Sequence, residues 1–500
     1  MVFDILAALM SPMMIAFIIF GLLLGNLVGA LPGLTATMTL AVLMPLTYHL
    51  PVEVGLIILG SIYIGSMRGG GISAILVNVP GTPADIATTF DGYPMAKQGK
   101  ARDALMMSIF GSVMGGIIGT LFLLIACLPL ARIALEFGPA EMFWISILGI
   151  SIMVGISEGS LVKGVISGLF GLSLTTIGVS PLGGDTRFTF GIPWLAGGVH
   201  MIAGMIGLYC IPRVIELAQE IRKEKQEVLE LKGSVHTAMG RAIKEWFSGI
   251  GGLVSGLIGS IIGAIPGAGS NIGGIVAYDW MKRLSKNPEN FGKGEIKGVE
   301  ASETANNAVV STSLIPTLAF GIPGSPPAAL ILGAILVQGL LPGRRLFVEY
   351  GFETYTFMGG LLLANILLLP VGMYTSNLYS RIMYVPREAM AVIIAVLSVV
   401  GTMAIRGNIA DVYMMGVIGI IMYFAGRAGF SPAPAVLGLV LGGLAEEGLT
   451  QSMMIASARD GLFLYFATRP ITLVLILLTI LSLSLPYIQR YYRKKRNGRR

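Results

Sequence analysis

The stretch GNLVGALPG, residues 25–33, interrupts a run that is otherwise as apolar as a membrane-spanning helix. Its glycines and its proline oppose a continuous helix, because proline lacks an amide hydrogen and glycine favours irregular backbone. The same pattern returns as GSIIGAIPG at residues 259–267, 234 positions further along the chain. The recurrence indicates two related halves, each with a broken helix at the corresponding place.

A second pair of motifs follows the first at a similar distance. NVPGTPA at residues 78–84 and GIPGSPPA at residues 321–328 share a Pro-Gly-hydroxyl-Pro core, with an offset of 243 residues. One Gly-Pro break in a membrane helix is most often a kink or a close-packing site. Paired breaks in corresponding positions instead point to a transporter site, where discontinuous helices or re-entrant hairpins turn free backbone groups toward a ligand.

Composition places the chain in a membrane. Hydrophobic residues make up 54% of it and charged residues 12%, and the mean hydropathy is +0.80. We expect an all-α polytopic membrane protein of about 11 or 12 spans, each crossing about 30 Å of hydrocarbon, with two structural repeats. The expected divisions are a first membrane repeat (1–212), a cytoplasmic amphipathic linker (213–245), a second membrane repeat (246–488) and a basic cytoplasmic tail (489–500).

The net charge of +7 is concentrated beside membrane segments, above all in IQRYYRKKRNGRR at residues 488–500. Basic residues mark the cytoplasmic ends of spans, so we expect contact with lipid and no nucleic-acid partner. The histidines and cysteines are scattered without metal-ligand spacing, and the sequence has no phosphate loop, nucleophile elbow or zinc-protease motif. We therefore expect no enzyme, no metal site and no cofactor other than a coupling ion.

Small polar residues follow each break and suit an anionic ligand. A helix that restarts after a Pro-Gly turn presents free N–H groups and the positive end of its dipole, which together bind a carboxylate. N-capping of the restarted helix explains any single one of these residues equally well. The candidate substrate-binding residues are Gly33, Thr35, Thr37, Pro80, Gly81, Thr82, Gly267, Ser270, Asn271, Pro323, Gly324 and Ser325. The candidate structural breaks are Gly29, Pro32, Gly263 and Pro266.

Acidic and amide side chains near these breaks are candidates for ion coupling, because a carboxylate inside a membrane is costly and marks function. They are Asp85, Asp91, Glu303, Asn306 and Asn307. For Asp91 a simple interfacial turn is favoured, since Gly and Pro follow it, whereas Asp85 has the stronger case for facing the interior. For Glu303 the alternative is a solvated first helical turn. Arg68 is either a clamp for a substrate carboxylate or an interfacial anchor, and the anchor is slightly favoured.

Three blocks of sequence together resemble one family. The doubled G-x-x-x-G-A-x-P-G pattern, the stretch VPGTPADIATTFDGYPMAKQGKA (79–101) and the block from SETANNA to FGIPGSPPAALILGA (302–334) resemble the large membrane subunit of tripartite tricarboxylate transporters, the TctA family. The matching positions are Gly29, Pro32, Gly33, Gly263, Pro266 and Gly267 in the repeated signature, and Pro80, Gly81, Thr82, Asp91 and Gly92 in the region of the first hairpin.

This resemblance implies a secondary transporter of the bacterial inner membrane. Such a permease imports citrate or another carboxylate with a Na⁺ or H⁺ gradient, and it works with a small four-span membrane subunit and a periplasmic solute-binding protein. The family is thought to be similar in fold to transporters with inverted repeats and elevator-like movement. The alternative, from another class, is a channel or a packing scaffold without coupled transport.

Overall fold

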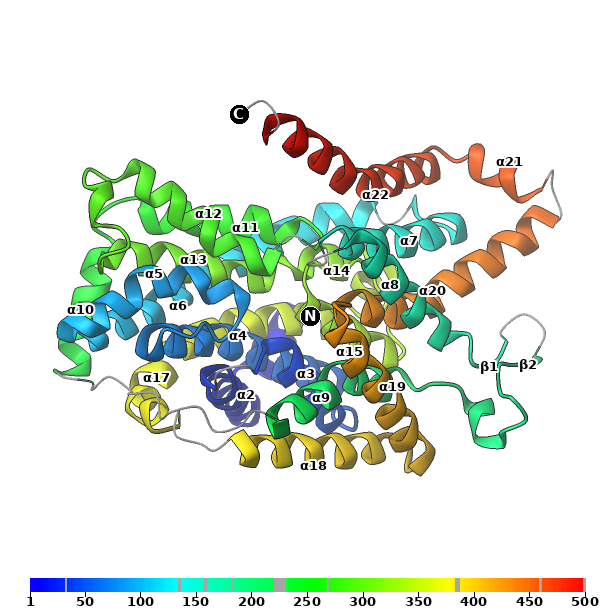
Figure 1. The fold of residues 1–500 in the computed structure, drawn as a ribbon, viewed down its shortest axis with the longest axis horizontal. Helices are drawn as coiled ribbons and strands as arrows, with labels where there is room; N and C mark the ends of the chain where they lie inside the picture. Colours follow the sequence, from blue (N-terminus) through cyan, green and yellow to red (C-terminus); the bar gives the residue numbers. More distant parts are fainter. Residues whose placement is uncertain are drawn as a thin grey trace.

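The computed structural model describes residues 1–31, 34–133, 136–156, 160–180, 184–219, 231, 233–267, 269–382, 387–457 and 461–497, and nearly all of them are helical (Figure 1). The strands β1 (Gly178–Val179) and β2 (Thr186–Arg187) form a small antiparallel hairpin at the right of Figure 1. The prediction of an all-α polytopic membrane protein is confirmed.

The helices have the following bounds. In chain order they are α1 (Val2–Leu9), α2 (Pro12–Ala30), α3 (Ala36–Thr47), α4 (Val52–Val77), η1 (Pro83–Asp85), α5 (Ile86–Met95), η2 (Ala96–Lys100), α6 (Ala101–Ile133), α7 (Pro139–Ile156), α8 (Leu161–Thr175), η4 (Pro193–Gly197), α9 (Met201–Gln219), α10 (Val235–Trp246), α11 (Gly251–Ala264), α12 (Gly269–Leu284), η5 (Pro288–Asn290), α13 (Ile296–Thr312), α14 (Leu314–Phe320), α15 (Pro326–Val337), α16 (Arg344–Val348), α17 (Gly351–Ile382), α18 (Arg387–Arg406), α19 (Ile409–Arg427), α20 (Pro432–Ser457), α21 (Leu462–Ala467) and α22 (Pro470–Asn497).

Among the residues with assigned positions, eight helices are long and apolar enough to cross a membrane. A ninth is added if α10 and α11, which meet at 78°, count as one broken span. Five further apolar stretches of the described residues are shorter, namely Ala36–Thr47, Pro139–Ile152, Leu161–Thr175, Pro326–Val337 and Pro470–Ser484. The number of 11 or 12 spans stays a prediction.

Both copies of the repeated glycine motif lie where a helix ends. The first copy closes α2 at Ala30, and the second closes α11 at Ala264. A Cβ on Gly29 would overlap the backbone of α4, and a Cβ on Gly263 would overlap α13. Glycine therefore permits the close contact of α2 with α4 and of α11 with α13. Pro32 and Gly33 lie outside the described residues.

The central helices α4 and α13 are buried on all sides. Every residue from Gly55 to Leu76 and from Gly298 to Thr312 is shielded. A helix without an exposed face belongs in the interior of a large protein. By contrast, α18 and α19 expose apolar side chains that suit lipid contact, including Val392, Val396, Val400, Tyr413, Val417 and Phe424.

Each half of the chain packs several helices against one long helix of the other half. Helix α13 of the second half lies against α6, and α4 of the first half lies against α17. In the same way, α11 packs on α6 while α2 packs on α17, and α10 packs on α6 while α1 packs on α17. Corresponding contacts of this kind support the two repeats predicted from the sequence.

The predicted linker, 213–245, divides into two parts. Helix α9 continues to Gln219, past the predicted boundary, and residues 220–230 and 232 lie outside the described part of the chain. Helix α10 buries one face, formed by Ala238, Met239, Ala242 and Trp246, and packs on α6. This burial fits the amphipathic character expected of the segment, and its cytoplasmic side stays a prediction.

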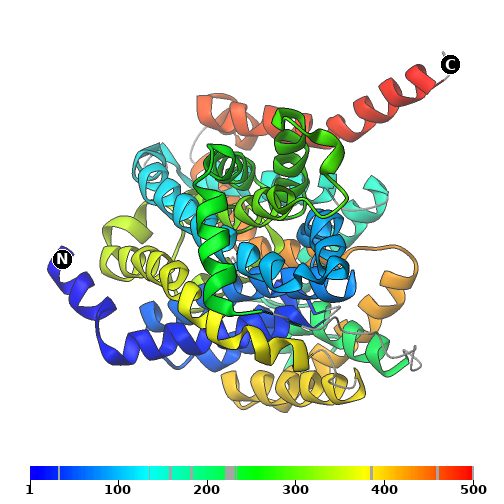
Figure 2. The same ribbon diagram turned by 90° about the vertical axis from the view of Figure 1, so that its left-hand side faces the viewer.

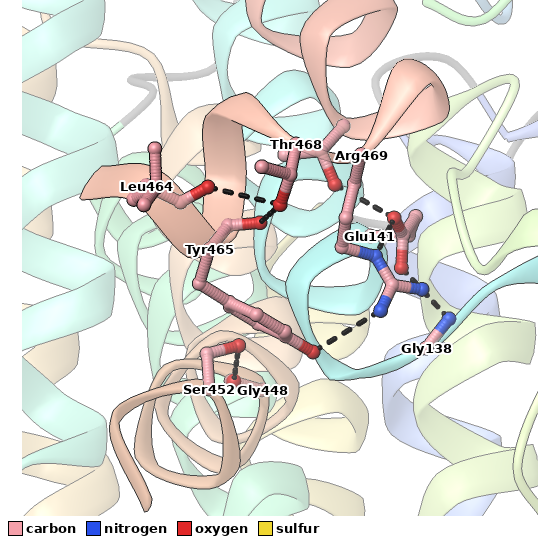
Figure 3. A network of polar contacts seen from close by, with 9 residues as sticks. Gly138, Glu141, Gly448, Ser452, Leu464, Tyr465, Thr468 and Arg469 are labelled. Atoms are coloured by element: carbon pink, nitrogen blue, oxygen red, sulfur yellow. Dashed lines mark hydrogen bonds and ion pairs between the residues drawn. The ribbon is translucent and has the colours of Figure 1, made fainter. Parts of the chain in front are cut away.

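A polar cluster fastens the C-terminal helices to the start of α7 (Figure 3). The Glu141 carboxylate accepts hydrogen bonds from Arg469 Nε and Thr472 Oγ1, each at 2.7 Å, and from the Gly138 amide at 2.8 Å. Arg469 also donates to the Tyr465 hydroxyl at 3.2 Å. Because the Glu141 side chain is 1% exposed, its charge depends on these partners for compensation.

Candidate functional site

Two buried carboxylates, one from each half of the chain, lie against the glycine run of α4. Asp85 ends η1, Glu303 lies on α13, and both are 0% exposed. A Cβ on Gly70 would overlap the Asp85 carboxylate, and a Cβ on Gly71 would lie 2.6 Å from Glu303 Oε1. The glycine run therefore makes room for two carboxylates on neighbouring residues of one helix.

Asp85 accepts hydrogen bonds from Thr82, the residue just before η1, and from Asn306 of α13. Its Oδ2 accepts hydrogen bonds from the Thr82 amide at 2.8 Å and the Thr82 hydroxyl at 2.7 Å. Its Oδ1 accepts a hydrogen bond from Asn306 Nδ2 at 2.9 Å. The last contact joins two of the predicted ion-coupling residues, which are 221 positions apart in sequence.

Glu303 is surrounded by hydroxyl groups. Thr88 donates to Oε1 at 2.7 Å, while Ser108 and Ser112 of α6 donate to Oε2 at 3.0 and 3.1 Å. The Ser302 hydroxyl lies 3.0 Å from that of Thr88. The predicted alternative of a solvated first turn is wrong for Glu303, because the residue is fully buried in the middle of α13.

Two amides beside these carboxylates have unused polar atoms. Within the described part of the chain, Asn306 Oδ1 and both polar atoms of the Asn307 side chain have no hydrogen-bond partner. Both residues are at most 1% exposed. Asn307 lies one helical turn beyond Glu303 on the same face of α13. Buried amide oxygens without donors are costly in a structural core but are ordinary ligands for a cation.

Arg68 is buried in the same region. It is 0% exposed, and its Nη1 donates to Asn26 Oδ1 of α2 at 3.1 Å. The favoured sequence interpretation of an interfacial anchor is wrong, because an anchor would extend its guanidinium group to water. Its charge interacts with Glu303 electrostatically. When Asp85 and Glu303 are both ionised, Arg68 compensates only one of their two negative charges.

Asp91 occupies a different environment from Asp85. Its Oδ1 accepts hydrogen bonds from the amides of Gly292, Gly294 and Glu295, each at 2.8 Å, and its Oδ2 accepts one from the Tyr278 hydroxyl at 2.8 Å. It lies inside α5 and not in the interfacial turn favoured from the sequence. Four hydrogen bonds favour a structural role in fixing the segment before α13, and ion coupling through Asp91 stays a prediction.

The structure brings the glycine motif and the Pro-Gly motif of each half together. In the first corner, formed by Gly29, Gly70, Gly81, Thr82 and Asp85, the Gly81 amide lies 3.4 Å from the Gly70 carbonyl oxygen, and a Cβ on Gly81 would lie 2.8 Å from the Gly29 carbonyl oxygen. This geometry leaves no space for a larger residue at position 81.

The second corner repeats this arrangement with Gly263, Ser313, Gly324, Ser325 and Tyr63. The Gly324 amide donates to the Ser313 carbonyl at 3.2 Å, and a Cβ on Gly324 would lie 3.0 Å from the Gly263 carbonyl oxygen. The Ser325 hydroxyl lies 3.0 Å from the Tyr63 hydroxyl. Gly70 and Tyr63 mark the two corners on α4, about 10 Å apart along the helix axis.

The two corners differ in charge. With the offset of 243 residues between the Pro-Gly motifs, Ala328 corresponds to Asp85, Gly60 corresponds to Glu303, and Tyr63 corresponds to Asn306. The second corner thus has neutral or apolar residues where the first has its carboxylates and amide. Only the first corner, among these two, has the chemistry of a cation site.

Several predicted substrate-binding hydroxyls cap helices. Thr35 accepts a hydrogen bond from the Met38 amide at the start of α3, and Ser325 accepts one from the Ala328 amide at the start of α15. These bonds match the N-capping alternative. Thr37 is 7% exposed on α3. Substrate binding by these residues stays a prediction.

The remaining candidates lie near the two breaks. Gly267 has a φ of 77° and donates to the Gly324 carbonyl at 3.1 Å, so the second break and its Pro-Gly motif are joined directly. Pro80 and Pro266 are partly exposed, and Pro323 is buried. Ser270 and Asn271 belong to α12, and the positions of their side chains lie outside the described part of the structure.

Three hydroxyl residues of the site were missed by the sequence interpretation. They are Ser108, Ser112 and Ser302. A usable signal existed for the two α6 serines, because they stand four residues apart in an apolar run and so share a helix face. Their partner on α13 could not be identified without the tertiary structure.

Two cavities lie away from these corners. One, of about 330 Å³, lies between the start of α7, the end of α14 and α20. The other, of about 500 Å³, lies between α10, α11, α12 and the start of α13. The second cavity reaches Glu300, one turn before Glu303 on α13.

Comparison with known proteins identifies the family. The sequence profile described as "Tripartite tricarboxylate transporter TctA family" matches residues 15–437. An Agrobacterium vitis protein described as an uncharacterized 52.8 kDa protein in the TAR-I ttuC' 3'region is 36% identical over 437 residues, which cover 87% of this chain and 85% of that protein. A second, from the TAR-II ttuC' 3'region, is 36% identical over 224 residues, covering 44% of this chain and 91% of that protein. No solved structure matches. The chain belongs to the TctA family of tripartite tricarboxylate transporters.

Proposed function

We propose that this chain is the carboxylate permease of a tripartite uptake system in the bacterial inner membrane. A periplasmic solute-binding protein delivers a tricarboxylate such as citrate or a similar carboxylate, and a small four-span membrane subunit completes the assembly. A Na⁺ or H⁺ gradient drives uptake. Family membership supports the type of subunit, and the interior of the structure supports coupling to an ion.

One observation carries the coupling: carboxylates from both halves, Asp85 and Glu303, converge beside an amide oxygen of Asn306 that has no partner among the described residues. With both carboxylates ionised, the pair and Arg68 are one positive charge short of neutrality, and one monovalent cation or one proton balances this charge. Within the described ranges, no group of three or more His, Cys, Asp or Glu residues could hold a metal ion.

Cation binding would change the stability of the first corner. Without the ion, the uncompensated charge lies in a low-dielectric interior, where it is strongly disfavoured. With the ion bound, one cation contacts both Asp85 of η1 and Glu303 of α13 and so links these two segments. Movement of one repeat against the other is then favoured in the loaded state, which couples carboxylate uptake to the ion gradient.

The decisive experiment is uptake of a panel of labelled carboxylates by cells that express this chain with its small subunit and binding protein. Gradients of Na⁺ and H⁺ are varied separately. We expect saturable accumulation above equilibrium that requires the binding protein and one of the two gradients. Flux that does not saturate and does not need the binding protein would identify a channel, and no uptake with all three components inserted would reject the proposal.

A further inference from the structure

We propose that the coupling cation reaches the buried carboxylates Asp85 and Glu303 through the 500 Å³ cavity between α10 and α13, with Glu300 as the intermediate carboxylate. The inference rests on the proposed function and adds the route of the ion to it. Helix α10, which contributes to the lining of the cavity, lies at the end of the molecule that faces the viewer in Figure 2. The rim of the cavity includes Lys286 and Asn287, which are exposed.

Glu300 lies where the cavity meets the core. It lines the cavity, is 2% exposed, and its Oε2 has no hydrogen-bond partner within the described residues. Gly251, at the start of α11, faces it, because a Cβ there would lie 3.6 Å from Glu300 Oε1. A larger residue at position 251 would contact the Glu300 carboxylate group.

The next carboxylate along α13 is Glu303. Residues three apart lie on the same face of a helix and are separated by about 4.5 Å along its axis. From Glu300 the face leads to Glu303, and from there across the α4 glycine run to Asp85. The three carboxylates therefore follow one another in the order Glu300, Glu303 and Asp85 from the cavity to the first corner.

The charges in the cavity favour a cation over an anion such as a lipid phosphate. Three carboxylates, Glu245, Glu295 and Glu300, face two lysines, Lys286 and Lys297. The Lys297 ammonium is already close to Glu245, at 3.7 Å. With Glu300 ionised, the balance of charge in the cavity is negative, and the Oε2 atom of this buried residue has no hydrogen-bond partner among the described residues.

The corresponding position in the other half of the chain carries no carboxylate. The residue that corresponds to Glu300 with the same 243-residue offset is Ile57, which is 1% exposed and lies in the main hydrophobic core. A cation cannot be passed along an apolar helix face. The asymmetry between the two corners therefore extends to the approach from the surface.

The test compares Glu300→Gln with Glu295→Gln in proteoliposomes that contain the complete complex. Both variants remove one carboxylate from the same cavity, but only the first removes the buried one. Two rates are measured: uptake driven by an ion gradient, and exchange of labelled for unlabelled carboxylate with saturating ion and binding protein on both sides. Exchange needs substrate binding and movement but no net passage of the ion.

We expect Glu300→Gln to lower gradient-driven uptake by at least about ten-fold, a barrier increase of about 1.4 kcal/mol, and to leave exchange within about two-fold. Glu295→Gln and Glu300→Asp should retain most of the uptake. Unchanged uptake in Glu300→Gln, or equal loss of uptake and exchange, would overturn the route while leaving the permease intact. Absence of exchange in the unmodified complex would instead reject the proposed function.

Discussion

Replacing Asp85 by Asn is the sharpest test of the buried cation site. The change keeps the size of the side chain but removes its charge. One amide oxygen cannot serve both Thr82, which donates twice to Oδ2, and Asn306, which donates to Oδ1. The new NH₂ group must therefore face a donor on one side. The substitution therefore removes one negative charge and also places two hydrogen-bond donors against each other.

The expected magnitude follows from Coulomb's law. A monovalent ion about 4 Å from one carboxylate gains about 4 kcal/mol at an effective dielectric constant of about 20. Desolvation of the carboxylate in the unmodified site offsets part of this gain, which leaves about 2–4 kcal/mol. Each 1.4 kcal/mol is ten-fold, so the half-saturating concentration of the coupling ion should rise by about 30- to 1,000-fold.

The assay is carboxylate uptake into proteoliposomes as a function of Na⁺ concentration and, separately, of pH. The matched control is Asp103→Asn, which removes a carboxylate that pairs with Arg241 at the edge of α6. We expect the control to keep the ion dependence of the unmodified protein. An Asp85→Asn variant with unchanged half-saturation for both ions would refute the assignment of the site.

Three further substitutions test the surroundings. Gly70→Ala places a methyl group where the Asp85 carboxylate lies, so uptake should fall at least about ten-fold. Gly416→Ala meets no neighbour within 4 Å and should leave uptake unchanged. Equal uptake in the two variants would contradict the packing argument. Asp91→Ala removes four hydrogen bonds and should lower the free energy of unfolding by about 3–5 kcal/mol. A thermal unfolding midpoint equal to that of the unmodified protein would show that the carboxylate is dispensable. Arg469→Gln leaves the buried Glu141 carboxylate without its cationic partner and should lower the free energy of unfolding by about 1–3 kcal/mol, measured by thermal unfolding. The half-saturating ion concentration should stay unchanged. A changed ion dependence would mean that this cluster takes part in coupling.

The limits of sequence interpretation are clearest for the acidic residues. Asp85 and Asp91 are six positions apart, and both follow the same Pro-Gly motif. One reaches the interior beside Asn306, and the other binds three backbone amides of the segment before α13. Local pattern favoured Asp85 for the interior, but it placed Asp91 in a turn. Thr82 is a local partner of Asp85, but Asn306 and the partners of Asp91 come from the second half of the chain and have no local signal.

Arg68 also shows a limit of sequence interpretation, because its local sequence does not reveal whether it is buried. Beside Gly69 to Gly71, Arg68 is interpreted from the sequence as a substrate clamp or, slightly favoured, an interfacial anchor, but these glycines lie inside α4, where two of them face carboxylates. An arginine beside glycines has the same local sequence whether its guanidinium group ends in water or in the core. Only the packing of α2 and α13 around α4 distinguishes these cases.

The sequence by itself determined the membrane class, the two paired motifs and the family, because hydropathy and short repeated patterns are properties of consecutive residues. It also marked Asp85, Glu303, Asn306 and Asn307 as unusual for a membrane interior. The tertiary structure alone decided that the first corner carries charge and the second does not, and that hydroxyls of α5 and α6 surround Glu303. The physical reason is that burial and hydrogen bonding of these groups arise from contacts between helices about 200 residues apart in the chain, which no local pattern encodes.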